Sequence, residues 1–170
     1  MRGVRPHPGP GGVDVRRLIV EADGGSRGNP GPAGYGALVR DAVTGEVLAE
    51  RAGYLGIATN NVAEYRGLVA GLRAARGIDP AAAIDVRLDS KLLVEQMSGR
   101  WKIKHPDMRT LAAIARGVAS GATVTYTWHA RARNSDADAL ANEAMDTESP
   151  SIRRGHNADG RDEEDDLGLF

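Results

Sequence analysis

Four carboxylates are the side chains of this sequence best suited to chemistry. Each stands at the end of an expected strand or in the first turn of an expected helix, and they are Asp23, Glu64, Asp89 and Asp138. Ligands of open α/β sheets gather beyond the carboxyl ends of parallel strands, so these side chains can converge at one sheet edge. Clustered carboxylates without cysteine or histidine form an all-oxygen site suited to Mg²⁺ or Mn²⁺. Without a metal ion, the four carboxylates would raise one another's pKa.

Each carboxylate also has a purely structural interpretation. Asn61 with Glu64, and Ser135 with Asp138, have the spacing of a capping box, in which the acid bonds a backbone amide at the helix start. The other two acids could support a turn or stand beside an N-cap. For any single acid the structural interpretation is favoured, whereas four acids at one edge of the same sheet favour a site.

Alternating strand and helix patterns must position these acids. Strands are predicted over residues 18–20, 35–40, 46–54, 84–88 and 124–128, and helices over 61–76, 91–97, 107–119 and 136–145. This order predicts an α/β fold with a five-stranded mixed sheet, in which three antiparallel strands precede two parallel ones, flanked by helices. Gly67 and Gly71 lie one turn apart and would let the first helix lie close to the sheet.

The chain divides into one folded segment and two termini of different composition. Residues 1–14 are rich in Gly and Pro, and residues 147–170 hold seven acidic against three basic residues. We expect both to be disordered, as an N-terminal extension and an acidic C-terminal tail, because they have few apolar side chains. The expected domain, residues 15–146, holds 17 basic and 15 acidic residues. The net charge of −1 therefore combines an acidic C-terminal tail with a mildly basic domain. A mildly basic domain is compatible with a partner that has a phosphate backbone.

The composition excludes several classes of protein. The sequence has no cysteine, which removes disulfides, thiol nucleophiles and zinc–thiolate sites and indicates a reducing, cytoplasmic location. No apolar run is long enough to span a bilayer, and the N-terminus lacks the apolar stretch of a signal peptide. We therefore expect a cytoplasmic monomer without membrane contact.

A glycine-rich loop, DGGSRGNPGPAGYG at residues 23–36, is the strongest local signal. It is neither a dinucleotide-binding motif nor a P-loop, because no Lys-Ser/Thr follows and it leads into a strand. Together with TNNVAEYRGL (59–68), LDSKLLVEQ (88–96) and RNSDADALAN (133–142), it resembles the type 1 ribonuclease H family in both order and spacing. The resemblance covers residues 17–146 and is greatest for the compact bacterial form, which also occurs fused to a phosphatase-like domain.

This resemblance implies the ribonuclease H fold and a metal-dependent endonuclease. Family members hydrolyse the RNA strand of RNA–DNA hybrids and leave 5′-phosphate and 3′-hydroxyl ends. The catalytic metal ligands that it implies are Asp23, Glu64, Asp89 and Asp138, with Asp23 bridging two Mg²⁺ ions and Mn²⁺ as an alternative. In such sites one ion activates the attacking water and the other stabilises the leaving 3′ oxygen.

The resemblance also implies a set of substrate-binding residues. The family recognises the shape of the hybrid, through 2′-hydroxyls of the RNA strand and a phosphate pocket for the DNA strand. The matching positions here are Gly24, Gly25, Ser26, Asn29, Thr59, Asn60, Asn61 and Ser90. Glycine suits this loop because backbone approaches a groove closely only where no Cβ intervenes.

Two departures from the family pattern limit which properties of the family can be expected of this chain. The long basic insertion of larger members is reduced to GRWKIKHPD at residues 99–107, so weaker, more salt-sensitive hybrid binding is expected. Trp101 there either contacts the hybrid or packs the connection. The loop that carries a mobile histidine in many members is too short here, so we expect His129 to be non-catalytic. Arg131 is expected to stabilise developing charge near a phosphate.

Two other functions remain open from the sequence alone. The same fold could carry an inactive module that binds hybrids or double-stranded RNA, although a pure binder gains nothing from carboxylates that face phosphates. It could also carry an Mg²⁺-dependent phosphohydrolase of small molecules, although the sequence has no nucleotide-cradling motif.

Overall fold

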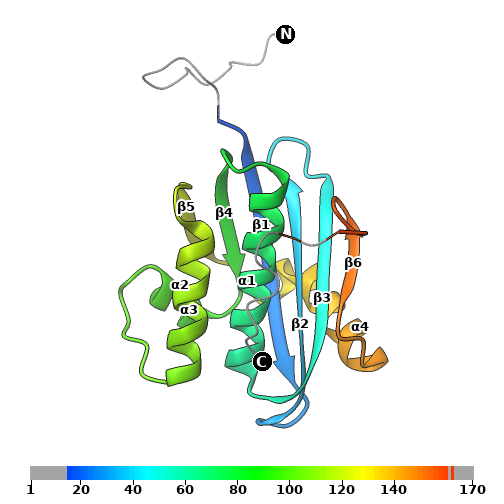
Figure 1. The fold of residues 1–170 in the computed structure, drawn as a ribbon. Coiled ribbons are helices and arrows are strands. Elements are labelled where there is room, and N and C mark those ends of the chain that lie inside the picture. The colour runs from blue at the N-terminus through cyan, green and yellow to red at the C-terminus, as the bar shows by residue number, and fades with distance from the viewer. Residues whose placement is uncertain (1–14, 161, 163–170) are drawn as a thin grey trace.

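A mixed six-stranded β-sheet forms the centre of the protein (Figure 1). The structure is a computed structural model, and it describes residues 15–160 and 162. The strands are β1 (Arg17–Ser26), β2 (Gly31–Asp41), β3 (Val47–Ala58), β4 (Ala83–Leu88), β5 (Val124–Trp128) and β6 (Ile152–Gly155). They lie in the order β5-β4-β1-β2-β3-β6. β1, β2, β3 and β6 pair antiparallel, whereas β4 pairs parallel with both β1 and β5.

Helices cover both faces of this sheet, as Figure 1 shows. They are α1 (Asn60–Ile78), α2 (Lys91–Met97), α3 (Pro106–Ala119) and α4 (Ser135–Thr147), with a 3₁₀ turn, η1 (Arg131–Arg133), before α4. α1 packs on β1, β2 and β3 with α3 beside it, and α4 packs against the same strands from the opposite face. None of the helices within the described residues is long and apolar enough to cross a membrane.

The α/β class and the order of the first five strands confirm the sequence-based expectation. The continuous apolar run at the start of β1 is buried on both faces, as expected for a central strand. The parallel register of β1 and β4 ends at the pair Ala22 and Leu88, so Asp23 and Asp89 come next at the same edge. The sheet topology therefore brings two of the four acids together.

We expected residues 147–170 to form a disordered tail, and this expectation is wrong for the part of the segment that the structure describes. Ile152–Gly155 form β6, which pairs antiparallel with residues 49–52 of β3 and gives the sheet its sixth strand. Ile152 packs against the core cluster under α4, with Leu38 and Leu140. A four-residue strand paired through its backbone needs no periodic side-chain pattern, so periodicity in the sequence could not predict it. The expectation for residues 1–14, 161 and 163–170 lies outside the described residues.

A buried ion pair holds the end of this segment on the sheet. Arg51 donates from Nε and Nη2 to the two carboxylate oxygens of Asp162, at 2.9 and 3.1 Å, and the side chains are 4% and 2% exposed. Arg51 also donates to the carbonyl oxygens of Glu50, Arg154 and His156. Burial alone would raise the pKa of Asp162, but the hydrogen bonds and charge of Arg51 leave that pKa lowered. The arginine therefore ties three parts of the segment to β3.

Replacing one member of this pair is expected to destabilise the protein. Asp162→Asn leaves a buried guanidinium without its counter-charge, which costs about 3 kcal/mol of unfolding free energy. The melting temperature, followed by circular dichroism, should fall by roughly 6–12 °C. The matched control is Asp159→Asn, which changes an exposed aspartate of the same segment and should leave the melting temperature unchanged. Equal melting temperatures for the two variants would show that the segment is not held as described.

Candidate active site

Three of the four predicted acids meet at the carboxyl ends of β1 and β4. Asp23, Glu64 and Asp89 each offer one carboxylate oxygen, and these atoms lie within 4.8 Å of one another. Asp23 is buried, with 9% of its surface exposed, and the other two are half-buried. The fold therefore brings these three side chains, whose convergence the sequence predicted, within reach of one ion.

Glu64 reaches this edge because α1 lies directly on β1. A Cβ atom on Gly24 would lie 2.2 Å from the carbonyl carbon of Ala63 and 2.3 Å from the backbone nitrogen of Glu64. A Cβ atom on Gly67 would lie 2.7 Å from the carbonyl oxygen of Asp23. Both contacts are too close for any side chain, so glycine at the two positions allows strand and helix backbones to touch. The close packing expected through Gly67 is confirmed.

Asp138 completes the group from the first turn of α4. Its carboxyl group lies beside that of Asp23 and contributes to the raised pKa of Asp23. Asn142, one turn further along α4, donates from Nδ2 to Oδ2 of Asp138 at 3.2 Å. The four acids thus come from β1, α1, the end of β4 and α4, as the sequence predicted.

Two asparagines to which the sequence reasoning gave no role support these acids. Asn134 is fully buried, donates from Nδ2 to the carbonyl oxygen of Ala22 at 2.9 Å, and hydrogen-bonds with Asp89. Asn142 orients Asp138. Both asparagines belong to the RNSDADALAN block, and that block is the signal that could have identified them.

The capping-box interpretation of the acids is wrong. Thr59 is the N-cap of α1, and its hydroxyl accepts from the backbone nitrogen of Val62 at 3.3 Å. Glu64 therefore lies beyond the first turn, and its carboxylate hydrogen-bonds with Ser90 instead. Asn134 is the N-cap of α4 and makes no side-chain capping bond. Neither acid is needed to begin its helix, which leaves both available to a site.

The acids are held in an environment that disfavours their charged forms. Burial, the charge of Asp89 and the neighbouring carboxyl group of Asp138 raise the pKa of Asp23 to about 8. Burial and the charge of Asp89 raise the pKa of Glu64 to about 7, against the opposing effects of Ser90 and Arg131. Burial also raises the pKa of Asp89. The charge of Arg131 compensates the cluster only in part, and a bound cation would supply further positive charge.

The donor set of this cluster fits a divalent metal ion. All of its ligand atoms are carboxylate oxygens, which are the hard donors that Mg²⁺ and Mn²⁺ prefer. The raised pKa of Asp23 and of Glu64 shows that the cluster holds negative charge poorly on its own. The residues present thus match a cation by both atom type and charge.

The predicted substrate-binding residues lie around the same edge. Gly24, Gly25, Ser26 and Asn60 line a pocket of about 300 Å³ together with Asp23, Glu64, Asp138 and Arg131. The hydroxyl of Ser26 is buried and has no hydrogen-bond partner among the described residues. Asn29 Oδ1 accepts from the backbone nitrogen of Asn60 at 3.2 Å, which joins the β1–β2 turn to the start of α1.

The remaining predicted positions flank this pocket at helix starts. Thr59 caps α1, and Asn61 follows Asn60 in its first turn. Ser90 caps α2, because its hydroxyl accepts from the backbone nitrogen of Leu93 at 3.3 Å. The structure therefore gives Thr59 and Ser90 capping roles, at helix starts beside the acids.

Arg131 and His129 occupy different electrostatic surroundings. Arg131 lines the acidic pocket, and its charge lowers the pKa of both Glu64 and Asp89. The pKa of His129 is lowered by burial and then by the charges of Arg87 and Arg133, and His129 is not among the described residues that line the pocket of the acids. Of these two side chains, it is therefore Arg131 that lies beside the acids.

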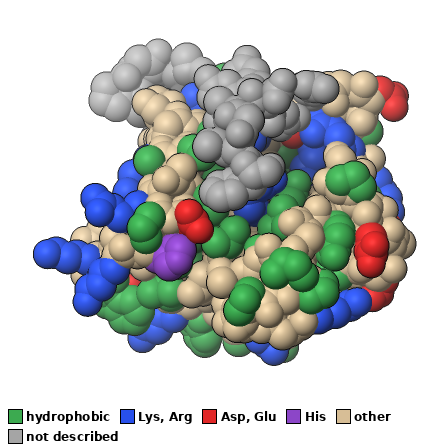
Figure 2. All heavy atoms as spheres, turned by 60° about the horizontal axis from the view of Figure 1, so that its bottom comes forward, with side chains coloured by type: hydrophobic (Ala, Val, Ile, Leu, Met, Phe, Trp, Pro, Cys, Tyr) green, Lys and Arg blue, Asp and Glu red, His purple; other side chains and the backbone are tan. Residues whose placement is uncertain are grey.

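The connection between α2 and α3 is exposed. Trp101 has 47% of its surface exposed, and Lys102 and Lys104 are exposed beside it. Figure 2 shows basic side chains that project from the side of the molecule carrying α2 and α3. The alternative that Trp101 simply packs this connection is therefore disfavoured.

Comparisons with known proteins agree with this fold and site. A family model described as "Reverse transcriptase-like" matches residues 21–144. The "Bifunctional protein Rv2228c" of Mycobacterium tuberculosis is 57% identical over 136 residues, which are 79% of this chain and 37% of the relative. The solved N-terminal RNase H domain of that protein superposes with a TM-score of 0.75 and covers 78% of this chain and 95% of the domain. LC11-RNase H1, solved in complex with an RNA/DNA hybrid, is 36% identical with a TM-score of 0.73 and covers 77% and 98%.

The strand order β5-β4-β1-β2-β3-β6 and the four carboxylates at one edge of the sheet are those of a ribonuclease H-like protein. The carboxylates form an acidic cluster that fits a metal ion. The chain belongs to the type 1 ribonuclease H family. The family resemblance seen in the sequence is thereby confirmed. The chain spans only 37% of the length of the first curated relatives that it matches.

The raised pKa values predict how pH acts on the metal-free protein. The pKa of Asp23 rises from 3.8 to about 8 and that of Glu64 from 4.5 to about 7, so the folded state keeps protons that the unfolded state releases. In chelator, the unfolding free energy should therefore decrease as pH rises from about 4 to about 8. Thermal melts at successive pH values measure this, and Asp23→Asn should flatten the decrease.

Two further measurements complete this pH test. Asp159→Asn, the exposed control, should keep the wild-type slope. Added Mg²⁺ should raise the melting temperature more at pH 8 than at pH 5, because protons compete with a cation for the carboxylates. A melting temperature independent of pH across this range would contradict the electrostatic description of the cluster.

Proposed function

We propose that this protein is an endonuclease that hydrolyses the RNA strand of RNA–DNA hybrids and leaves 5′-phosphate and 3′-hydroxyl ends. The observation that carries this proposal is the convergence of four carboxylates from four elements, in a chain that belongs to the type 1 ribonuclease H family. The hybrid seen with the similar LC11-RNase H1 supports the same substrate class. The absence of cysteine supports a cytoplasmic location.

In this proposal Asp23, Glu64, Asp89 and Asp138 hold two Mg²⁺ ions, with Mn²⁺ as an alternative. When bound, such ions supply an activated water and neutralise charge on the leaving oxygen. Asn134 and Asn142 orient Asp89 and Asp138 by the hydrogen bonds described above. The burial of Asp23 excludes bulk water from one side of the cluster, which strengthens its interaction with a cation.

The residues around the acids are proposed to bind the hybrid. Gly24 and Gly25 present backbone without side chains, and Ser26 offers a hydroxyl that is otherwise unsatisfied among the described residues. Asn29, Thr59, Asn60, Asn61 and Ser90 complete the proposed contact surface. Arg131 places a positive charge beside the cluster without serving as a base, because a guanidinium stays protonated at neutral pH.

Asp89→Asn is expected to abolish most cleavage while the fold remains intact. A neutral amide is a poor metal ligand, and bound metal supplies several kcal/mol of transition-state stabilisation, so the rate should fall by more than about a hundredfold. Cleavage of a labelled hybrid, a double-stranded RNA and a double-stranded DNA, with Mg²⁺ and with chelator, measures the effect.

The matched control for this test is Asp85→Asn, on β4, the strand that Asp89 follows. Asp85 accepts from the hydroxyls of Thr125 and Thr127 on β5, away from the cluster, so the control should retain activity. Hybrid binding without cleavage by the wild-type protein would favour the non-catalytic module. Cleavage of small phosphate esters alone would favour the phosphohydrolase.

A pair of variants tests whether Arg131 or His129 assists the reaction. Arg131→Ala removes a positive charge that lines the acidic pocket and should lower turnover by about tenfold or more. His129→Ala should change turnover by less than about twofold, since His129 is not among the described residues that line the pocket of the acids. Single-turnover hybrid cleavage at saturating Mg²⁺ compares the two variants. The reverse order would make His129 the catalytic group.

A further inference from the structure

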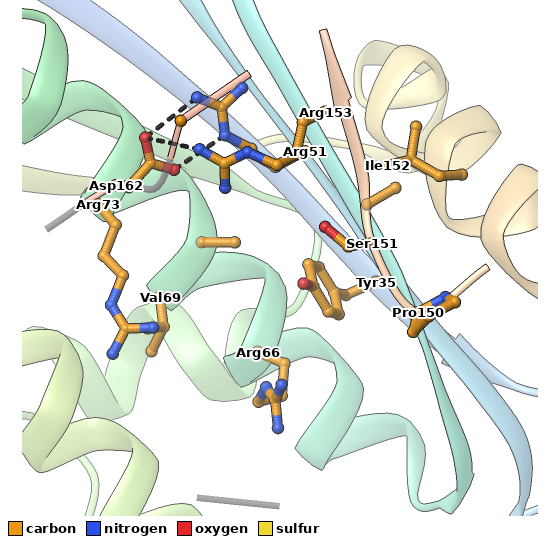
Figure 3. Close-up of a pocket in the computed structure, with 13 residues that line it drawn as sticks. Tyr35, Arg51, Arg66, Val69, Arg73, Pro150, Ser151, Ile152, Arg153 and Asp162 are labelled. Carbon is orange, nitrogen blue, oxygen red and sulfur yellow. Dashed lines mark hydrogen bonds and ion pairs between the residues drawn. The ribbon is translucent and has the colours of Figure 1, made fainter. Parts of the chain in front are cut away.

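The two edges of the sheet are held by different side-chain contacts. At the β6 edge, the ion pair of Arg51 and Asp162 holds the C-terminal segment, as Figure 3 shows. At the opposite edge, Trp128 ends β5 and donates from its indole Nε1 to the backbone carbonyl oxygen of Asp89 at 3.0 Å. The indole contact therefore ends on one of the four acids of the candidate active site.

Asp89 stands where the backbone pairing of β4 stops. The last residue of β4 is Leu88, which pairs with Ala22 of β1 on one side and with Trp128 of β5 on the other. The backbone nitrogen of His129 donates to the carbonyl oxygen of Leu88 at 2.8 Å, and the indole of Trp128 donates to the next carbonyl along. The indole thus extends the contact between β5 and β4 by one residue, to the acid itself.

Two side chains from different elements thereby hold Asp89. Asn134 is fully buried, donates to the carbonyl oxygen of Ala22 on β1 and hydrogen-bonds with Asp89. Trp128 holds the backbone of the same acid from β5. The side chain of Asp89 is therefore fixed from one neighbouring strand and its main chain from the other.

The same indole contact also bears on Glu64, through Ser90. The carbonyl group of Asp89 belongs to the planar peptide that leads to Ser90, so a hydrogen bond to that carbonyl also orients the backbone of Ser90. The hydroxyl of Ser90 accepts from the backbone nitrogen of Leu93 at 3.3 Å, which begins α2. The side chain of Ser90 also lowers the pKa of Glu64. One indole N–H group therefore acts on two of the acids.

Packing alone does not account for Trp128. The residue has 52% of its surface exposed, whereas tryptophan is largely buried in most proteins. The indole has a single polar group, a donor, and that donor meets the backbone of a proposed metal ligand. Trp128 is not among the described residues that line the acidic pocket, so its route to the acids runs through Asp89.

We propose that Trp128 is a positioning residue of the acidic cluster. Its indole N–H holds the main chain of Asp89 so that the carboxylates of Asp89 and Glu64 are placed to bind a divalent cation. Loss of a hydrogen bond that orients a metal ligand typically weakens metal binding by about ten- to a hundredfold. The proposal rests on the function proposed above only in assigning that cation to the cleavage of hybrids.

Metal binding by the full chain without substrate tests this role. Mn²⁺ is titrated at constant ionic strength, and the free ion is measured by electron paramagnetic resonance. Trp128→Phe keeps an aromatic ring but removes the N–H donor, and it should weaken Mn²⁺ binding by about tenfold. Trp128→Gln removes the ring but keeps an N–H donor on a side chain of similar reach, and it should bind Mn²⁺ more tightly than Trp128→Phe.

The matched control is Trp101→Phe, which changes the other tryptophan of the sequence. Trp101 is similarly exposed, at 47%, and its replacement should leave Mn²⁺ affinity unchanged. Melting temperatures in chelator should stay within about 4 °C of the wild type, because one hydrogen bond at a half-exposed site contributes little to folding. Wild-type Mn²⁺ affinity in Trp128→Phe, or binding by this variant at least as tight as by Trp128→Gln, would overturn the proposal.

A second measurement needs no variant at this position. Coupling between two sites is reciprocal, so a hydrogen bond that strengthens metal binding is itself strengthened when the metal binds. Mg²⁺ should therefore slow hydrogen exchange of the Trp128 indole N–H, followed by NMR, by up to about tenfold. The indole N–H of Trp101 is the internal control and should exchange at the same rate with and without Mg²⁺. An exchange rate of Trp128 that is independent of Mg²⁺ would contradict the coupling.

Cleavage kinetics separate this role from the function proposed above. Trp128→Phe should raise the Mg²⁺ concentration needed for half-maximal hybrid cleavage, leave KM for the hybrid unchanged and recover turnover in excess Mg²⁺. A wild-type protein that does not cleave hybrids would contradict the proposed function, whereas the Mn²⁺ affinities still decide the role of Trp128. Weaker hybrid binding by Trp128→Phe in chelator, with Mn²⁺ affinity unchanged, would make Trp128 a substrate contact and overturn the positioning role.

Discussion

The contact between the backbone of β1 at Gly24 and the backbone of α1 at Glu64 is the constraint on which the candidate site depends. With no side chain between them, strand and helix approach closely enough for the carboxylates of Asp23 and Glu64 to share one small volume. The parallel pairing of β1 with β4 then adds Asp89 at the same edge. The remaining acid, Asp138, depends on α4, which begins at the buried Asn134. Asp23, Glu64 and Asp89 are thus positioned by backbone contacts between elements, and Asp138 is positioned by the helix that Asn134 begins.

This arrangement costs stability in the absence of a cation. Burial and neighbouring charge raise the pKa of Asp23 and of Glu64, which means that the fold holds these groups where their charged forms are unfavourable. Such conflicts between local preference and global fold concentrate at functional sites. Elsewhere the described part of the protein compensates charge well, as the buried pair of Arg51 and Asp162 shows. The contrast distinguishes a site from a structural ion pair.

The sequence predicted most of the fold and the four acids, because apolar periodicity and short motifs report local structure directly. It failed where structure depends on distant partners. Arg51 and Asp162 are 111 residues apart, and β6 is paired through backbone atoms that carry no sequence signal. The two capping boxes were plausible from spacing, but Thr59 and Asn134 begin these helices instead. The support that Asn134 gives to Asp89 required knowledge of which side chains the fold buries.

The short strand β6 also determines which sheet edges the protein offers to other chains. Unpaired backbone groups along an edge strand are a template for pairing with a second molecule, and native proteins cover or shorten such edges. β6 occupies the edge of β3 opposite residues 49–52, and the adjoining arginines place charge along the new edge. A chain lacking this segment would present β3 as an open edge. The C-terminal segment therefore bears on self-association of the protein as well as on its folding.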